Sequence, residues 1–262
     1  MKKIIAKISN EGILPPLRRR LNWYWVQLRI NNHTVGKIVE RLGNYVVLDR
    51  LWFSLDCPLI STPHKSTILF GLHEIEERRL TKNWISSDLP VVEFGGGLGV
   101  VSCLTSRILS DHIPHIVVEA NPAMIPALNR NRALNGCDFR ILNAALGYDA
   151  EFVFLNIDEE FVGSSLREKN KGETVKVKST SLAHILDKEQ IERVQIICDI
   201  EGLESDLIRR EILHDKRVEA LLVEMHPQIL GVDHVASLFK ELLDDGFALR
   251  ETIGDVSYFE RK

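Results

Sequence analysis

One segment constrains the fold of this chain more than any other. An apolar strand-like run at 91–94 is followed at once by a glycine-rich turn at 95–99 and by a helix-like run at 100–109. Glycines let the backbone approach a ligand closely, and the first turn of a helix offers free amide groups. The segment therefore predicts an α/β domain with a ligand-binding loop after its first strand.

The same alternation continues toward the end of the sequence. We expect further strands at 115–119, 139–142, 151–156, 174–178, 194–198 and 220–226. We expect helices at 71–84, 122–134, 182–186, 204–213 and 232–243, and an antiparallel hairpin made by 247–252 and 256–260. The pattern predicts a doubly wound, Rossmann-like α/β fold with a mostly parallel sheet, whose ligand lies at the carboxyl ends of the strands.

Residues 1–70 do not share this alternation. Two short apolar runs, 46–48 and 51–53, predict a small β element within an N-terminal appendage, which leaves residues 71–262 as the main domain. Within the appendage, residues 18–30 mix arginines with aromatic residues, including Trp23 and Trp25. This composition is typical of an amphipathic helix that packs on its own domain or on a partner subunit, so a homodimer through this segment is a reasonable expectation.

Composition excludes several classes of protein. The formal net charge of -4 provides no global positive field for binding nucleic acid. No apolar stretch approaches the roughly 18 residues of a membrane-spanning helix, and the start of the chain does not resemble a secretory signal. The four cysteines are widely spaced without a CxxC pair, which favours reduced core residues in a cytoplasmic protein.

The spacing of the glycines argues against a dinucleotide. The dinucleotide fingerprint requires glycine at the first, third and sixth positions of the turn, but Gly95, Gly97 and Gly99 are followed by Val100 at the sixth. We expect Glu93 to lie near the mouth of the loop, where a carboxylate repels a pyrophosphate and attracts a sulfonium or ammonium group. At the end of the second strand, Glu119 is placed to accept hydrogen bonds from ribose hydroxyls. Taken singly, either carboxylate could be an ordinary strand-end residue.

Together these residues support a family resemblance. Its elements are residues 71–74, 93–99, 119–122, 143–147, 163–166 and the signature Asp-Ile-Glu-Gly-Leu-Glu at 199–204. They resemble the FkbM family of class I S-adenosylmethionine-dependent methyltransferases over about residues 70 to 230. The resemblance implies S-adenosylmethionine as cofactor and O-methylation of a hydroxyl on a sugar, glycan or secondary metabolite. On these motifs, the implied cofactor-binding residues are Glu74, Glu93, Gly95, Gly97, Gly99, Glu119, Asn121, Asn143 and Ala144.

A catalytic cluster is predicted at two strand ends. Asp199 and Glu201 are two residues apart, as are Glu224 and His226, so each pair projects to one face if the backbone stays extended. The strand order that the resemblance implies makes the two strands neighbours and brings Asp199, Glu224 and His226 together. Either Asp199 or His226 could serve as the general base for a hydroxyl. A divalent cation held by Asp199, Glu224 and His226 is a second, less favoured interpretation.

Other interpretations stay open at this point. Glu204 is expected to serve only the dipole of the helix that it begins, His226 could be a satisfied histidine before Pro227, and the loop 163–165 could be a substrate loop or a plain turn. The chain could also be a degenerate methyltransferase fold that binds a partner. A third possibility is an NAD-dependent or nucleotide-sugar enzyme on the same fold.

Overall fold

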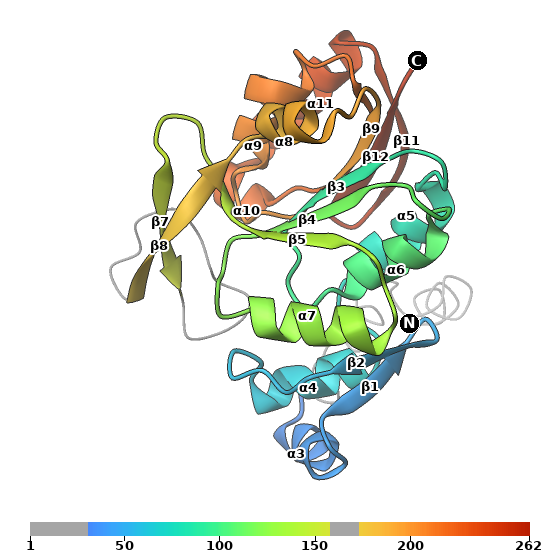
Figure 1. Cartoon of the computed structure of the whole chain (residues 1–262), viewed down its shortest axis with the longest axis vertical. Helices are drawn as coiled ribbons and strands as arrows, with labels where there is room; N and C mark the ends of the chain where they lie inside the picture. The colour runs from blue at the N-terminus through green and yellow to red at the C-terminus, as the bar shows by residue number, and fades with distance from the viewer. Residues whose placement is uncertain (1–30, 158–172) are drawn as a thin grey trace, which may run out of the picture.

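A computed structural model describes residues 31–157 and 173–262. Residues 18–30 and the loop 163–165 therefore lie outside the described residues. A seven-stranded sheet, in the order β11-β12-β10-β9-β3-β4-β5, forms the centre of the molecule (Figure 1). Its strands are β3 (Val91–Phe94), β4 (His115–Glu119), β5 (Arg140–Asn143), β9 (Val194–Cys198), β10 (Val218–Glu224), β11 (Phe247–Ile253) and β12 (Val256–Arg261).

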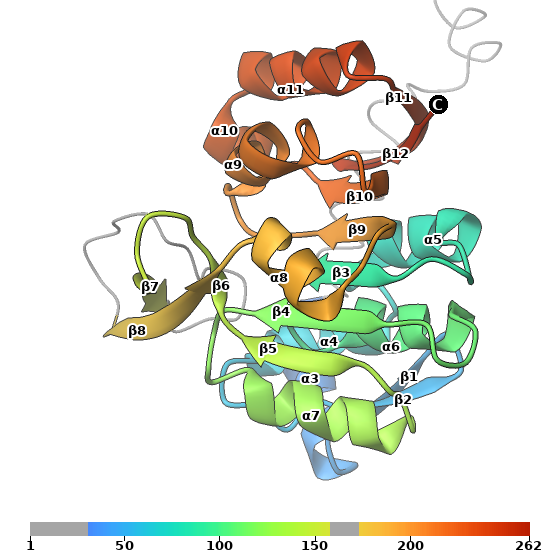
Figure 2. The same ribbon diagram turned by 45° about the horizontal axis from the view of Figure 1, so that its top comes forward.

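Strands β10, β9, β3, β4 and β5 are parallel, whereas β12 runs antiparallel to both of its neighbours. The last two strands form the expected antiparallel hairpin, and β12 inserts between β10 and β11. The carboxyl ends of the parallel strands consequently meet at one edge of the sheet, as the arrowheads in Figure 2 show.

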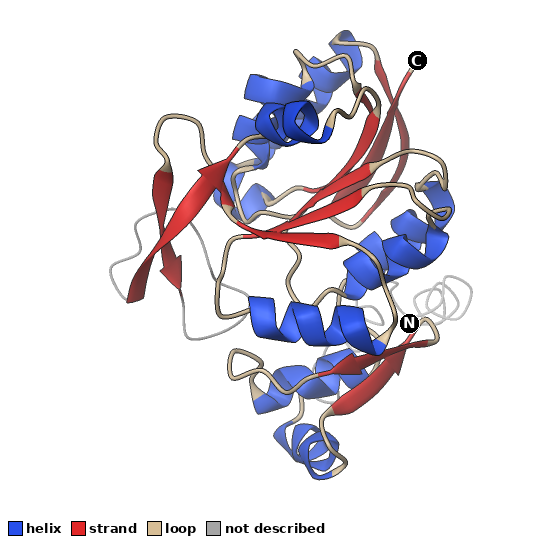
Figure 3. Cartoon of the chain, viewed as in Figure 1, coloured by secondary structure: helices blue, strands red, loops and turns tan. Residues whose placement is uncertain are grey.

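Helices cover both faces of the sheet (Figure 3). One face carries α5 (Ile75–Trp84), α6 (Val100–Ile108) and α7 (Ile125–Leu134). The other carries α8 (Leu182–Glu189), α9 (Glu204–Leu207), the π-helical turn η1 (Ile208–Ile212), α10 (Pro227–Leu230) and α11 (Val232–Asp244). This arrangement confirms the predicted doubly wound α/β fold with its mainly parallel sheet.

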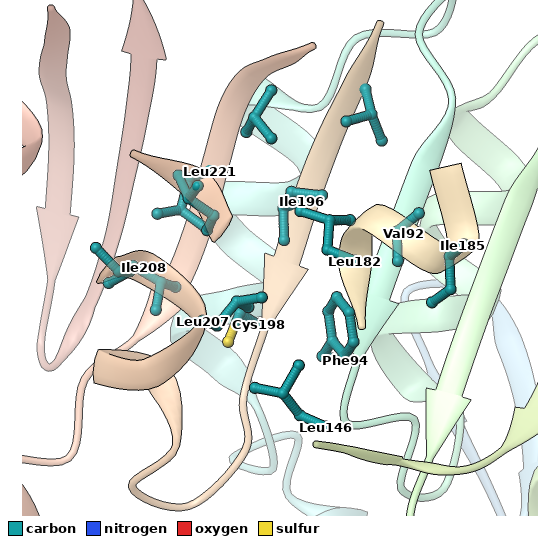
Figure 4. Packing of buried hydrophobic residues seen from close by; sticks show 14 of the residues in the cluster. Val92, Phe94, Leu146, Leu182, Ile185, Ile196, Cys198, Leu207, Ile208 and Leu221 are labelled. Atoms are coloured by element: carbon teal, nitrogen blue, oxygen red, sulfur yellow. The ribbon is translucent and has the colours of Figure 1, made fainter. Parts of the chain in front are cut away.

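The central strands consist mainly of apolar residues because helices cover both faces of the sheet. In β9 every residue is buried: Ile196 and Cys198 face the layer of α8 and α9, whereas Ile197 packs with α5 on the opposite face. Figure 4 shows Ile196 and Cys198 among the side chains of α8 and α9. Consecutive residues of one strand thus belong to two different cores, which fixes the register of the strand.

The described part of the appendage packs on the helical layer rather than on the sheet. It comprises α3 (His33–Arg41), β1 (Tyr45–Leu48), β2 (Leu51–Ser54) and α4 (Thr62–Leu69). Strands β1 and β2 pair antiparallel, as the two short apolar runs predict. Phe53 of this hairpin shares one core with Leu98 and with Leu128 of α7. A helical/β appendage is expected from the sequence for residues 1–70, but without the positions of α3 and α4.

A second, three-stranded ribbon in the order β6-β8-β7 stands beside the carboxyl edge (Figures 1 and 2). Its strands are β6 (Ala145–Leu146), β7 (Phe152–Ile157) and β8 (Glu173–Thr180). Strands β7 and β8 correspond to the strands expected at 151–156 and 174–178. Leu146 and Leu155 of this ribbon line the main cavity, which opens at the carboxyl edge of the sheet, so the ribbon closes one side of that cavity.

Within the described ranges, no helix is both long enough and apolar enough to cross a membrane.

Candidate functional site

The glycine-rich turn after β3 makes a close contact with the end of β9. Gly95 has a φ of +98°, and a Cβ built on it would lie 1.9 Å from the carbonyl oxygen of Asp199. A side chain is therefore excluded at this position both by conformation and by space. Gly97 and Gly99 also have positive φ values, +49° and +80°, which accounts for the alternate spacing of the glycines.

Glu119 ends β4 and turns its carboxylate onto this loop. Its Oε2 accepts a hydrogen bond from the Gly97 amide at 2.7 Å, and its Oε1 accepts one from the Asn121 amide at 2.6 Å. Burial raises the pKa of Glu119, although these amide donors oppose the effect. An ionised carboxylate has about four lone-pair sites, so both oxygens keep capacity to accept a hydrogen bond from a ligand.

The expectation for Glu93 is wrong in its geometry. The Glu93 side chain lies on the face of β3 that packs against α6, because it alternates with Phe94, which lines the main cavity. Its carboxylate accepts a hydrogen bond from Ser102 Oγ at 2.5 Å and lies 3.1 Å from His115 Nε2. All three side chains are buried, so Glu93 fastens the sheet to its helical layer and does not line the cavity.

A cavity of about 610 Å³ opens at the carboxyl edge of the sheet. This volume suits a nucleoside-sized ligand with part of an acceptor. Seven carboxylates line it: Glu74, Glu76, Glu77, Glu119, Asp199, Glu201 and Glu224. Among the described residues that line the cavity there is no lysine or arginine. A ligand in this space therefore meets an acidic lining in which histidine is the only basic residue type that the structure describes.

Six of the nine predicted cofactor-binding residues line this cavity: Glu74, Gly95, Gly97, Glu119, Asn121 and Ala144. The other three, Glu93, Gly99 and Asn143, do not. Gly99 instead begins α6, and its Cβ would meet Leu128 at 2.6 Å. The Asn143 amide donates to the backbone oxygens of Glu119 and Ala120 at 2.8 and 3.2 Å, so Asn143 supports the strand end that carries Glu119.

The three predicted catalytic residues converge at the acidic end of the cavity. His226 Nε2 lies 3.6 Å from Asp199 Oδ1 and 4.0 Å from Glu224 Oε1. One oxygen or nitrogen from each residue falls within 4.8 Å of the others, which is also compatible with a cation. Neighbouring β9 and β10 bring these residues together, in agreement with the strand order that the resemblance implies.

The pKa values of Asp199, Glu224 and His226 are all raised above their ordinary values. Desolvation raises the pKa of Asp199 to about 8, with His226 opposing the rise and Glu77 adding to it. Desolvation and the hydrogen bond to Glu77 raise the pKa of Glu224 to about 10. Desolvation lowers the pKa of His226, but the hydrogen bond to Glu204 outweighs it, and the resulting pKa is about 9. Crowded carboxylates and one histidine thus share protons near neutral pH.

Two residues of this cluster are absent from the sequence-based prediction of the site. Glu77 lies on α5 one turn after Glu74, so it reaches the cavity only because α5 packs over β10 and β12. Glu204 is fully buried and contacts His226 Nδ1 at 2.6 Å. The one sequence feature that points to Glu204 is its place in the signature at 199–204, although only a role at the dipole of the helix is expected for it from the sequence.

No protein-family model matches the chain, and no curated protein matches it in sequence. Solved structures do match. A ribosomal protein L11 methylase from Lactobacillus delbrueckii subsp. bulgaricus is 12% identical with a TM-score of 0.44, over 73% of this chain and 79% of that one. A precorrin-6y C5,15-methyltransferase from Geobacter metallireducens is 13% identical with a TM-score of 0.43, over 71% and 86%. Fibrillarin from Aeropyrum pernix, solved with natively bound S-adenosyl-L-methionine, is 11% identical with a TM-score of 0.42, over 70% and 76%.

Proposed function

We propose that this chain is an S-adenosylmethionine-dependent methyltransferase that methylates a hydroxyl of a sugar, glycan or secondary metabolite. The observation that carries the proposal is the cavity with seven lining carboxylates and no described lysine or arginine. A pyrophosphate would be repelled there, whereas a cofactor with a sulfonium and an ammonium group and no phosphate is attracted. In the sequence, Glu93 argues against NAD, but its side chain does not line the cavity. The carboxylates that do line it support the same conclusion.

The chain offers a distinct place for each part of such a cofactor. The loop at Gly95 and Gly97 lets the backbone approach, and Glu119 is free to accept hydrogen bonds from ribose hydroxyls. Asn121 and the apolar Ala144 and Leu146 line the same end of the cavity and suit a purine base.

The opposite end of the cavity supplies the chemistry for the acceptor. When bound, S-adenosylmethionine would supply an electrophilic methyl group to the acceptor oxygen, with S-adenosylhomocysteine as the leaving group. The neutral form of His226, which a pKa of about 9 favours at alkaline pH, would accept the hydroxyl proton on Nε2 as the new bond forms. Asp199, which is ionised above its pKa of about 8, would stabilise the resulting imidazolium and orient the hydroxyl.

The same charges bear on the choice of acceptor. Nucleic acid would bring phosphates toward the carboxylate-lined cavity, so a neutral hydroxyl acceptor fits the site better. A bound cation at Asp199, Glu224 and His226 stays the less favoured interpretation, because the crowded carboxylates can balance their charge with protons. On this proposal, chelation with EDTA leaves methyl transfer unchanged.

The test is calorimetric titration of S-adenosylmethionine, S-adenosylhomocysteine and NAD into the wild type, Glu119→Ala and Glu192→Ala. Glu192 is an exposed glutamate outside the cavity and serves as the matched control. We expect the first two ligands to bind the wild type and the control equally. Glu119→Ala should weaken both by about 10-fold to 100-fold, the range for loss of a charged hydrogen bond.

Two results would contradict the proposal. Preference for NAD would indicate a dehydrogenase or nucleotide-sugar enzyme on this fold. Absence of binding to the wild type would indicate a degenerate fold that serves a partner. If S-adenosylmethionine binds, release of S-adenosylhomocysteine in the presence of a panel of hydroxylated acceptors identifies the substrate.

A further inference from the structure

Glu204 and His226 form a buried pair at the catalytic end of the cavity. Glu204 Oε1 lies 2.6 Å from His226 Nδ1, and the two residues are 0% and 5% exposed. A second donor, the Gly202 amide, reaches the same oxygen at 3.0 Å. An oxygen that accepts from an amide and lies this close to a ring nitrogen is an acceptor for both, so the proton of this contact resides on Nδ1.

The backbone between Asp199 and Glu204 is shaped to make this contact. Glu201 has a φ of +51° and Gly202 a φ of +98°, so the chain turns sharply after β9 and brings Glu204 back beneath the strand end. A Cβ on Gly202 would lie 2.7 Å from Ile229, which packs beside His226 on the next element. A left-handed conformation at a residue other than glycine is costly, and it persists where the surrounding structure holds it.

The consequence appears on the other ring nitrogen. With Nδ1–H donated to Glu204, a neutral His226 has an unprotonated Nε2 that faces the cavity. Asp199 Oδ1 and Glu224 Oε1 lie 3.6 and 4.0 Å from that nitrogen, and both distances exceed a hydrogen bond. Glu201 adds negative charge from the turn after β9. Nε2 is thus placed to accept a proton from an incoming hydroxyl.

We infer that Glu204 is a positioning residue that fixes the ring orientation and the tautomer of His226 for proton abstraction. The inference rests on the proposed function for its catalytic meaning and replaces the helix-dipole role expected from sequence. Glu204 acts through His226 and does not line the cavity itself. The nearly isosteric Glu204→Gln substitution keeps an acceptor for Nδ1–H and removes the negative charge.

The decisive measurement is long-range ¹H–¹⁵N NMR of the imidazole rings across a pH titration, without cofactor or acceptor. His226→Asn assigns the His226 signals among the nine histidines. In the wild type we expect the neutral ring to carry its proton on Nδ1. In Glu204→Gln the pKa of His226 should fall by about 1 or more, because the adjacent carboxylate charge is lost.

A matched control is Glu211→Gln. Glu211 is also a buried glutamate, it accepts a hydrogen bond from the Ala183 amide at 2.7 Å, and it does not line the cavity. We expect this variant to leave the His226 signals unchanged. If Glu204→Gln does not fold, Glu204→Asp replaces it: the charge is retained, the side chain is shorter, and the preference for the Nδ1–H tautomer should weaken.

A neutral His226 protonated on Nε2, or a His226 pKa that does not respond to Glu204→Gln, would overturn the inference. The pH dependence of methyl transfer distinguishes a positioning role of Glu204 from a purely structural one. It is measured with an acceptor identified from the panel of hydroxylated compounds. In Glu204→Gln the acidic limb of the pH–rate profile should move to lower pH, while the KM for S-adenosylmethionine stays unchanged; an acidic limb that does not move would also overturn the inference. Failure of the proposed function shows separately, as absence of S-adenosylmethionine binding to the wild type.

Discussion

At the scale of single residues, the site depends on a contact between two loops that are distant in sequence. Gly95 and Asp199 are so close that even a methyl group at Gly95 would overlap the Asp199 carbonyl oxygen. The carbonyl belongs to the strand end that carries the carboxylate of Asp199. The position of the glycine-rich loop and the position of Asp199 are therefore coupled through the backbone.

This contact predicts the effect of Gly95→Ala. The methyl group must displace the Asp199 backbone, so we expect a stability loss of about 2–4 kcal/mol and loss of S-adenosylmethionine binding. The control is Gly136→Ala, where φ is also positive at +61° but no atom lies within 4 Å of the built Cβ. That variant should lose only about 1–2 kcal/mol, the conformational cost alone, and keep binding. Urea unfolding and calorimetry measure the two effects; equal losses in both variants would contradict the close contact.

The raised pKa values of the cluster predict how stability depends on pH. Asp199, with a pKa of about 8, binds its proton more tightly in the folded protein than in the unfolded chain. His226, with a pKa of about 9, does the same. Both contributions are fully present below the unfolded pKa values and are lost as pH rises through the folded values. The Asp199 contribution is lost between its unfolded pKa of 3.8 and about pH 8, and the His226 contribution between 6.5 and about pH 9, so both lower the melting temperature as the pH rises from about 4 to about 9.5.

The measurement is differential scanning fluorimetry of the wild type, Asp199→Asn and Asp149→Asn across this pH range. Asp199→Asn should flatten the decline, because the amide does not titrate. Asp149 is an exposed carboxylate and its variant should follow the wild type. Parallel curves for wild type and Asp199→Asn would show that the Asp199 proton is not bound more tightly in the folded state.

The sequence predicts the location of a side chain better where a strand ends than where a strand is buried on both faces. The predicted proximity of Asp199, Glu224 and His226 agrees with the structure, because each follows an apolar run at a carboxyl end. The sequence misplaces Glu93 because all four residues of β3 are buried, so hydropathy does not reveal which face each side chain takes. It does not predict the contact between Glu204 and His226, because that contact depends on a turn with two positive φ values.

At the scale of elements, α7 and the β1–β2 hairpin are joined by a buried asparagine. Asn131 Oδ1 accepts from the Ser54 amide at 2.7 Å, and its Nδ2 donates to the Leu98 oxygen at 2.9 Å. One side chain thus connects the hairpin, the helix and the loop that follows β3. Its position inside a core of apolar side chains makes these hydrogen bonds hard to replace with water.

We predict that Asn131→Ala lowers the free energy of unfolding by about 2–4 kcal/mol, because it leaves buried backbone groups without partners. Asn129→Ala on the exposed face of the same helix is the control and should change it by less than about 0.5 kcal/mol. Chemical denaturation monitored by tryptophan fluorescence gives both values. A near-neutral Asn131→Ala would show that the hairpin can detach without cost to the main domain.

The elements of the appendage were harder to predict than those of the sheet. Helix α3 contains Gly36, whose close approach to α4 is a tertiary contact: its Cβ would lie 1.7 Å from the Thr62 oxygen. Helix α4 begins Thr62-Pro63 and has no apolar stripe, since Lys65 and Ser66 are both buried. The helical state of α4 therefore follows from packing and not from a local pattern, whereas α3 has an Asn32 cap that accepts from the Thr34 and Val35 amides. The central strands are recognised by their continuous apolar composition.

At the scale of the whole molecule, the charge is distributed unevenly. The net charge is only -4, yet seven carboxylates line one cavity. Global composition alone therefore gives little indication of the preferred ligand, and the positions of the charges at the strand ends carry that information.

We keep the dimer as a prediction for the assembly. Residues 18–30 combine arginines with Trp23 and Trp25, a composition that favours association with a second copy. Multi-angle light scattering of the full chain should give about twice the 29.9 kDa of one chain, and deletion of residues 1–30 should return it to one. A 29.9 kDa species for the full chain at working concentration would contradict the prediction.

The insertion of β12 between β10 and β11 has a consequence for biosynthesis. The strand that delivers Glu224 and His226 remains an open sheet edge until β12 has paired with it. During synthesis the acidic site is therefore completed only after the β11–β12 hairpin has left the ribosome, later than the glycine loop and Glu119. On the proposed function, chains truncated within this hairpin should be recognised by their failure to bind the cofactor.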